Sequence, residues 1–197
     1  MKKSGQPRII TVFGSSRPRE GDAAYEQARA LGAALAARGF TSCTGGYGGV
    51  MEGVSRGAKD SGGRTIAVTA SFFRAKANRW VDEEIRVKTW QERLFELIHR
   101  GHGFIACAGG TGTLVELAVV WEMANKGILK NKKPVVVLGE FWEPVIARVR
   151  EVEVGHHSAW GEAQERLIHV APAPDDAAEF LASHFSAAAP SQQRRLL

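Results

Sequence analysis

The sequence contains only two cysteines, Cys43 and Cys107, and no apolar run that approaches eighteen residues. Two cysteines do not make a disulfide framework, and both fall in apolar segments, so we expect reduced thiols in the core. The first residues lack the apolar stretch of a signal peptide, and no segment is long enough to cross a membrane. These absences predict a cytoplasmic protein with no membrane partner.

Runs of five like charges and stripes of alternating basic and aromatic residues are also absent, so nucleic acid is not an expected partner. The net charge of +5, from 26 basic and 21 acidic residues, suits an anionic ligand but also simple solubility. His99, His102, His156 and His157 have no cysteine or carboxylate partners at metal-ligand spacing. We therefore expect no metal site.

Short apolar segments rich in β-branched residues alternate with helical patterns along the 197 residues. This alternation predicts an α/β protein with a mainly parallel sheet of about seven strands and helices on both faces. The predicted strands are 8–13, 40–44, 64–69, 85–88, 103–107, 134–138 and 167–170. The predicted helices are 23–38, 50–61, 90–100, 114–126, 142–152 and 177–185. We expect one domain, 1–185, a flexible tail, 186–197, and a surface connection at 155–161.

One glycine-rich loop follows the predicted strand 103–107. It carries Gly109, Gly110, Thr111, Gly112 and Thr113. Glycines leave backbone N–H groups uncovered, threonines add hydroxyl donors, and the helix that follows points its positive end at the same spot. The pattern predicts a phosphate-binding loop. The alternative is a tight turn that needs glycine only for its backbone angles.

Two further loops follow the first and second predicted strands. They carry Gly14-Ser15-Ser16 and Gly45-Gly46-Tyr47-Gly48-Gly49. Ligands of parallel sheets bind beyond the carboxyl ends of the strands, so we expect Gly14, Ser15, Gly45 and Gly46 to line the same cleft. Neither a dinucleotide fingerprint nor a P-loop is present. The loops are suited to one phosphate held by backbone dipoles, and no cofactor is expected.

Taken together, the segments 12–16, 45–51 and 109–116 resemble the LOG family. These are cytokinin-activating phosphoribohydrolases, also called possible lysine decarboxylases, and the likeness covers residues 8–145. The resemblance implies a Rossmann-like fold, a homodimer, and hydrolysis of an AMP-like nucleoside 5′-monophosphate to free base and ribose 5-phosphate.

The resemblance also implies two catalytic residues, Arg93 and Glu116. Glu116 would stay ionised near the helix start and stabilise positive charge on the ribose, while Arg93 would orient it or complement the phosphate. Simpler interpretations are a helix-dipole carboxylate for Glu116 and a solvated or dimer-interface arginine for Arg93. The family has proline, lysine and glutamate where this chain has Ala108, Leu94 and Val115, which indicates a divergent member.

Two other functions compete with the hydrolase. The first is a non-catalytic protein that binds or carries a nucleotide or the molybdenum cofactor. The second, a pyridoxal-dependent decarboxylase, is disfavoured because Lys59, Lys88 and Lys126 lie away from the glycine loops. The segment 72–80 mixes aromatic and cationic residues, and it is either a lid that stacks on a base or a dimer contact.

Overall fold

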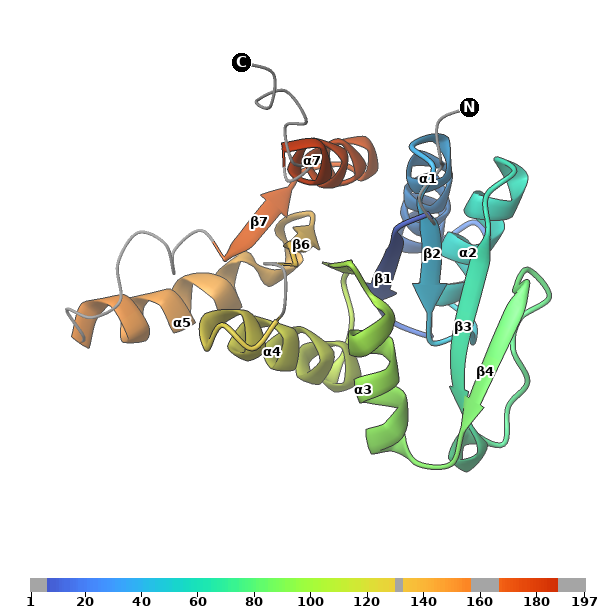
Figure 1. The fold of residues 1–197 in the computed structure, drawn as a ribbon, viewed down its shortest axis with the longest axis horizontal. Helices are drawn as coiled ribbons and strands as arrows, with labels where there is room; N and C mark the ends of the chain where they lie inside the picture. The colour runs from blue at the N-terminus through green and yellow to red at the C-terminus, as the bar shows by residue number, and fades with distance from the viewer. Residues whose placement is uncertain (1–6, 130–132, 157–166, 188–197) are drawn as a thin grey trace, which may run out of the picture.

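A computed structural model of the chain describes residues 7–129, 133–156 and 167–187 (Figure 1). Its strands form one fully parallel sheet in the order β4-β3-β2-β1-β5-β6-β7. They are β1 (Ile9–Phe13), β2 (Thr41–Thr44), β3 (Thr65–Ala70), β4 (Glu83–Val87), β5 (Gly103–Ala106), β6 (Val135–Leu138) and β7 (Ile168–Ala171). The predicted seven-stranded α/β fold is confirmed.

Helices cover both faces of this sheet (Figure 1). The α-helices are α1 (Ala23–Ala37), α2 (Val50–Asp60), α3 (Trp90–Arg100), α4 (Thr111–Asn125), α5 (Glu143–His156) and α7 (Pro174–Ala187). Two short 3-10 turns, η1 (Ser71–Phe73) and η3 (Glu140–Trp142), follow β3 and β6. Residues 188–197 of the predicted tail and 157–161 of the predicted connection lie outside the described residues. Within the described ranges no helix is both long and apolar enough for a membrane span.

Side chains that point alternately to the two faces of the sheet divide the core into two layers. Ile10 and Val12 of β1 pack with α1, α2 and α7, whereas Phe13 packs with α3, α4 and α5. Successive side chains of a strand point to opposite faces, so a strand buried on both faces is apolar throughout. Cys43 and Cys107 are free and buried in these layers, and burial raises the pKa of each thiol to about 12.

The order of the strands brings the glycine-rich loops to one edge. After β1 the chain builds outward through β2, β3 and β4, and then returns to place β5 on the other side of β1. The loops after β1 and β5 therefore diverge, which opens a crevice at the carboxyl ends of the central strands. Ser15 ties the loops together, because its N–H donates to the carbonyl of Ala108 (3.2 Å) and its carbonyl accepts from the N–H of Val50 (2.8 Å).

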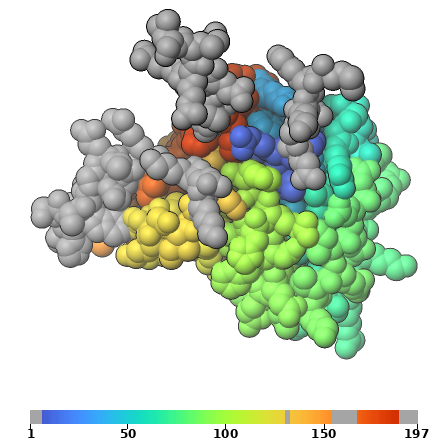
Figure 2. Space-filling model, in the orientation of Figure 1, coloured from blue at the N-terminus to red at the C-terminus, as the bar shows by residue number. Residues whose placement is uncertain are grey.

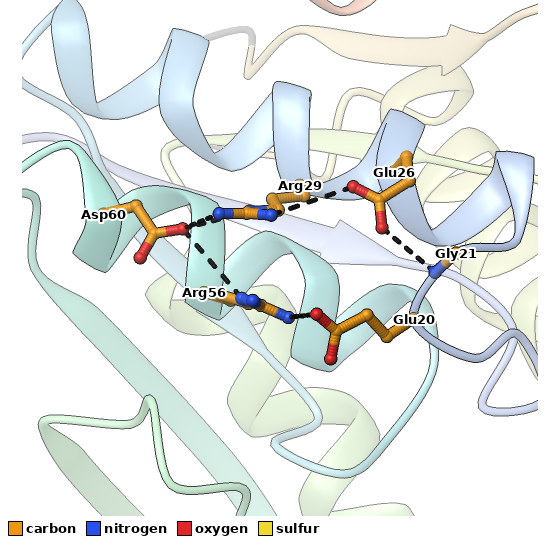
Figure 3. A network of polar contacts seen from close by, with 6 residues as sticks. All are labelled: Glu20, Gly21, Glu26, Arg29, Arg56 and Asp60. Atoms are coloured by element: carbon orange, nitrogen blue, oxygen red, sulfur yellow. Dashed lines mark hydrogen bonds and ion pairs between the residues drawn. The ribbon is translucent and has the colours of Figure 1, made fainter.

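Ion pairs anchor the loop between β1 and α1 to helix α2. Arg56 of α2 pairs with Glu20 in that loop, and Arg29 of α1 pairs with Asp60 of α2 at 2.6 Å (Figure 3). Each exposed pair contributes only about 0–1 kcal/mol to stability. Their arrangement links α2 both to α1 and to the loop that precedes α1.

Close packing of α1 on α2 depends on glycine. A Cβ at Gly57 would overlap the backbone carbonyl of Arg29, and a Cβ at Gly32 would overlap the carbonyl of Val54. Backbone atoms inside two packed helices cannot rotate away from such an overlap. The helices therefore approach each other at a distance that only glycine permits.

Replacing Gly57 with alanine is expected to lower the free energy of unfolding by about 2 kcal/mol, because the added methyl group overpacks the contact. Urea unfolding followed by circular dichroism measures the change. Gly112→Ala is the control, because a Cβ at Gly112 meets nothing within 4 Å. A Gly57→Ala variant as stable as the native chain would contradict this account of the contact between α1 and α2.

Candidate active site

A cleft of about 940 Å³ lies at the carboxyl ends of the central strands. Its wall comes from the loops after β1, β2 and β5, together with residues of α3 and α4. The predicted site residues found in the wall are Gly14, Ser15, Gly45, Arg93, Gly109, Gly110, Thr111, Gly112, Thr113 and Glu116. Gly46 is the predicted site residue outside the wall. Its φ of +78° makes the turn behind the cleft, where its N–H donates to Thr44 Oγ1 (3.1 Å).

The start of α4 presents free backbone N–H groups to the cleft. Gly110 is the N-cap, and no side chain caps the helix there. A Cβ at Gly110 or Gly112 would meet nothing within 4 Å, and neither residue has a positive φ. Backbone angles and packing thus do not require glycine at these two positions. Space for a ligand explains them better than the tight-turn alternative.

Gly45 has a different role, because its missing side chain makes room for the guanidinium of Arg93. A Cβ at Gly45 would overlap Arg93 Nη2. Arg93 reaches this position from the first turn of α3, which begins with a capping box between Thr89 and Glu92. The N–H groups of Lys88 and Thr89 donate to the Glu92 carboxylate and lower its pKa.

Arg93 is held in place on several sides and is only 7% exposed. Its Nε donates to the carbonyl of Val68 (2.9 Å), and its Nη1 lies 3.6 Å from Oε1 of Glu116. The guanidinium carbon lies 5.6 Å from the ring centroid of Tyr47 and 5.7 Å from that of Phe73. The interpretation of Arg93 as a solvated arginine is therefore wrong, because the side chain is buried and paired.

Glu116 is the buried partner of Arg93, with a side chain that is 14% exposed. Burial raises its pKa to about 7, although the charge of Arg93 acts in the opposite direction. The expectation of a carboxylate kept ionised by the helix start needs correction. Helix α4 begins at Thr111 rather than at residue 114, so Glu116 lies in the second turn, where the helix dipole has little effect.

Some cleft residues belong to no motif, namely Trp90 and Phe141. Tyr47 lies in the second glycine-rich loop, and Phe73 lies in the segment 72–80, for which a lid that stacks on a base is one of the two alternatives. Tyr47, Phe73, Trp90 and Phe141 add aromatic surface to the wall, and Arg17 adds an exposed cation. Arg17 follows Gly14-Ser15-Ser16 directly, so its position after the first strand was the one available signal. None of the described residues in the wall is a lysine, whereas pyridoxal chemistry needs a lysine amine in the pocket.

The departures from the LOG pattern at Leu94 and Val115 lie outside the cleft. Leu94 is buried in the core layer beneath α3, and Val115 is exposed on α4 at a separate groove between α3 and α4. Ala108 does line the cleft, next to the phosphate loop. The lost lysine and glutamate thus leave the pair of Arg93 and Glu116 intact.

Comparison with known proteins identifies the family of the chain. The model of the SLOG cluster4 family matches residues 7–166. The chain belongs to this family. It is 34% identical over 176 residues to a cytokinin riboside 5′-monophosphate phosphoribohydrolase from Mycobacterium marinum, covering 85% of this chain and 91% of that protein. An enzyme of the same name from Mycobacterium tuberculosis is 33% identical over 132 residues, covering 66% of this chain and 69% of that protein. The predicted LOG resemblance is confirmed.

Solved structures similar to this SLOG chain include proteins of a second functional class. The molybdenum cofactor binding protein from Rippkaea orientalis has a TM-score of 0.72 and 26% identity, over 92% of this chain and 99% of that one. The molybdenum cofactor carrier protein from Chlamydomonas reinhardtii has a TM-score of 0.70 and 26% identity, over 91% of this chain and 99% of that one. The relatives thus include proteins named as hydrolases and proteins named as cofactor carriers, the two leading alternatives of the sequence analysis.

The raised pKa of Glu116 predicts a characteristic pH dependence of stability. Between the ordinary value of 4.5 and about 7, the folded chain holds a proton that the unfolded chain has lost. The contribution of Glu116 to stability is therefore most favourable below pH 4.5 and declines as the pH rises to 7. Glu116→Gln removes this decline, so the variant gains stability relative to the native chain between about pH 5 and about pH 8. Urea unfolding of the variant and of the native chain at both pH values measures this gain. If the difference in the free energy of unfolding between the two proteins were the same at both pH values, the raised pKa of Glu116 would be contradicted.

Proposed function

We propose that this protein hydrolyses the N-glycosidic bond of a nucleoside 5′-monophosphate to free base and ribose 5-phosphate. The observation that carries the proposal is the buried pair of Arg93 and Glu116, which lies in the same cleft as the uncapped start of α4. The relatives named cytokinin riboside 5′-monophosphate phosphoribohydrolases support this substrate class. A cytokinin nucleotide is accordingly one candidate substrate.

In the proposed reaction the bond between C1′ and the base nitrogen breaks while a water oxygen bonds to C1′. The proton that the water loses ends on the departing base. Glu116 would accept this proton or stabilise the positive charge that develops on the ribose. A pKa of about 7 suits a group that must gain and lose a proton near neutral pH. Arg93, 3.6 Å away, would hold the carboxylate in position.

The phosphate would lie at the start of α4, on the free N–H groups of residues 110–113. Arg17 would supply the charge that these dipoles lack. Its guanidinium is exposed in the cleft wall and contacts no carboxylate among the described residues, whereas Arg93 is already paired with Glu116. Arg17 would thus be the cation available to a second anion.

Both catalytic substitutions, Glu116→Gln and Arg93→Ala, are expected to lower the release of adenine from AMP by about 10²–10⁴-fold. Chromatography of the free base measures the rate, and circular dichroism checks the fold. Glu122→Gln is the matched control, because Glu122 lies on the same helix, pairs with Lys126 and does not line the cleft. Undiminished base release by Glu116→Gln would refute the assigned role of this carboxylate.

Arg17→Gln is expected to weaken the binding of ribose 5-phosphate about tenfold, which corresponds to ~1.4 kcal/mol. The loss should shrink at high salt, because an exposed charge is screened. Arg19→Gln is the control, since Arg19 is exposed two residues away and does not line the cleft. Calorimetric titration gives both affinities, and equal losses in the two variants would count against a phosphate contact by Arg17.

The second candidate function is a carrier of the molybdenum cofactor without hydrolysis. The solved structures from Rippkaea orientalis and Chlamydomonas reinhardtii favour it, because they match this chain over almost its whole length. Both functions use a site for one phosphate. Base release from AMP separates them, since a carrier would bind a phosphorylated pterin and leave nucleotides intact.

We also propose that two copies of the chain assemble, as the LOG resemblance implies. Helices α3 and α4 lie side by side on the face shown in Figure 2. Between them Phe95 and Val115 expose apolar side chains over a groove of about 420 Å³. A large exposed apolar patch is commonly an interaction surface. The homodimer stays a prediction, for which sedimentation equilibrium is the test.

A further inference from the structure

Three aromatic side chains line the cleft together with Arg93, and we call them the aromatic wall. They are Tyr47 after β2, Phe73 in η1 and Trp90 at the start of α3. Phe73 is 42% exposed and Trp90 is 38% exposed. Apolar area left open inside a cleft is typical of a surface that a ligand covers.

Hydrogen bonds hold Tyr47, one member of the aromatic wall, in place. The Tyr47 hydroxyl donates to the carbonyl of Ala70 (3.2 Å) and accepts from its N–H (3.0 Å). The side-chain amide of Asn78 donates to the carbonyls of Gly46 (3.1 Å) and Tyr47 (3.0 Å). Phe73 packs edge-on against Tyr47, with ring centroids 5.5 Å apart. The loops after β2 and β3 are thus joined into one surface.

The turn that carries Phe73 is also strained. Arg74, the next residue, has a φ of +48°, and no other non-glycine residue of the described ranges has a positive φ. Such a conformation costs on the order of 1 kcal/mol and persists only where the surroundings impose it. Ser71 fastens the turn by donating its hydroxyl to the carbonyl of Val87 (3.2 Å), close to Trp90. The placement of Phe73 is therefore enforced by its surroundings.

The position of the aromatic wall follows from contacts already described. From the start of α4, the cleft passes Glu116, then Arg93 at 3.6 Å, and then the rings of Tyr47 and Phe73 at 5.6 and 5.7 Å from the guanidinium carbon. In the proposed function the phosphate lies at α4 and the ribose at Glu116. The third part of the substrate, its base, then extends over Arg93 to the aromatic wall.

The polar groups around the aromatic wall are poorly suited to reading the edge of a base. Among the described residues of the cleft, Glu116 is the only carboxylate, and none is asparagine or glutamine. The Tyr47 hydroxyl already donates and accepts through Ala70. Bases are distinguished through hydrogen bonds to their exocyclic groups, whereas stacking is tolerant because every base has an aromatic face.

We propose that Phe73 and Trp90 bind the base of the nucleotide by stacking, and that the site selects substrates by the size of the aromatic face. This inference rests on the proposed function, which supplies the positions of phosphate and ribose. The site then accepts adenine, hypoxanthine and guanine nucleotides with similar affinity, and it binds pyrimidine nucleotides less tightly.

Leucine variants at Phe73 and Trp90 test the proposal with a close control. Phe72→Leu makes the same change on the same turn, at a residue that is 72% exposed, packs edge-on against Phe73 (ring centroids 5.4 Å apart) and does not line the cleft. Calorimetric titration gives the affinity for AMP, IMP, GMP, UMP and ribose 5-phosphate. Phe73→Leu and Trp90→Leu should each weaken AMP binding about tenfold and leave ribose 5-phosphate binding unchanged. Phe72→Leu should change neither affinity.

Three results would overturn the inference. The first is an equal loss of affinity for AMP and for ribose 5-phosphate in the Phe73 and Trp90 variants. The second is a loss of AMP affinity in Phe72→Leu as large as that in Phe73→Leu. The third is a preference above about 100-fold between AMP and IMP, which would reveal recognition of the base edge. Base release by the native chain is measured in parallel. A native chain that binds AMP with the expected variant pattern but releases no base would overturn the hydrolase and retain the aromatic wall. Base release that is unaffected in every leucine variant would overturn the aromatic wall and retain the hydrolase. A native chain that binds no nucleotide would overturn both proposals.

Discussion

The buried pair of Arg93 and Glu116 is the interaction around which the cleft is organised. Burying an arginine is costly unless each part of its guanidinium has a partner. The chain supplies the carbonyl of Val68 and the carboxylate of Glu116, and it leaves out a side chain at Gly45 to admit the group. Removing the Glu116 carboxylate would leave the buried guanidinium without its ionic partner.

The sheet explains how residues so distant in sequence come together. Arg93 follows β4, Glu116 follows β5 and Gly45 follows β2, yet all three lie at one edge because every strand is parallel. The reversal between β1 and β5 opens the crevice, and the hydrogen bonds of Ser15 close its floor. The cleft therefore follows from the topology, while its chemistry depends on the few side chains that the loops direct into it.

Much of this arrangement could be predicted from the sequence, because β-branched runs and helical spacing are local signals. The seven strands and the three loops follow from such signals. The start of α4 was misplaced because Thr111 and Gly112 have the composition of a loop. The pKa of Glu116 could not be predicted, because it depends on burial by the rest of the fold. For the aromatic wall, the sequence offers the segment 72–80 as one alternative for a base-stacking lid, but Tyr47 and Trp90 come from two other segments, and only the folded chain brings the three together.

The divergence of this chain from the LOG pattern bears on the choice between hydrolase and carrier. Leu94 and Val115 stand where the family has charged residues, but Leu94 packs in the core and Val115 is exposed at the groove between α3 and α4, outside the cleft. Inside the cleft, the pair of Arg93 and Glu116 is present, and its carboxyl has a pKa suited to proton transfer. A carrier of an anionic ligand gains nothing from a buried carboxyl beside the phosphate loop, since any ionised fraction repels the cargo. A hydrolase needs that group, so its presence favours catalysis over carriage.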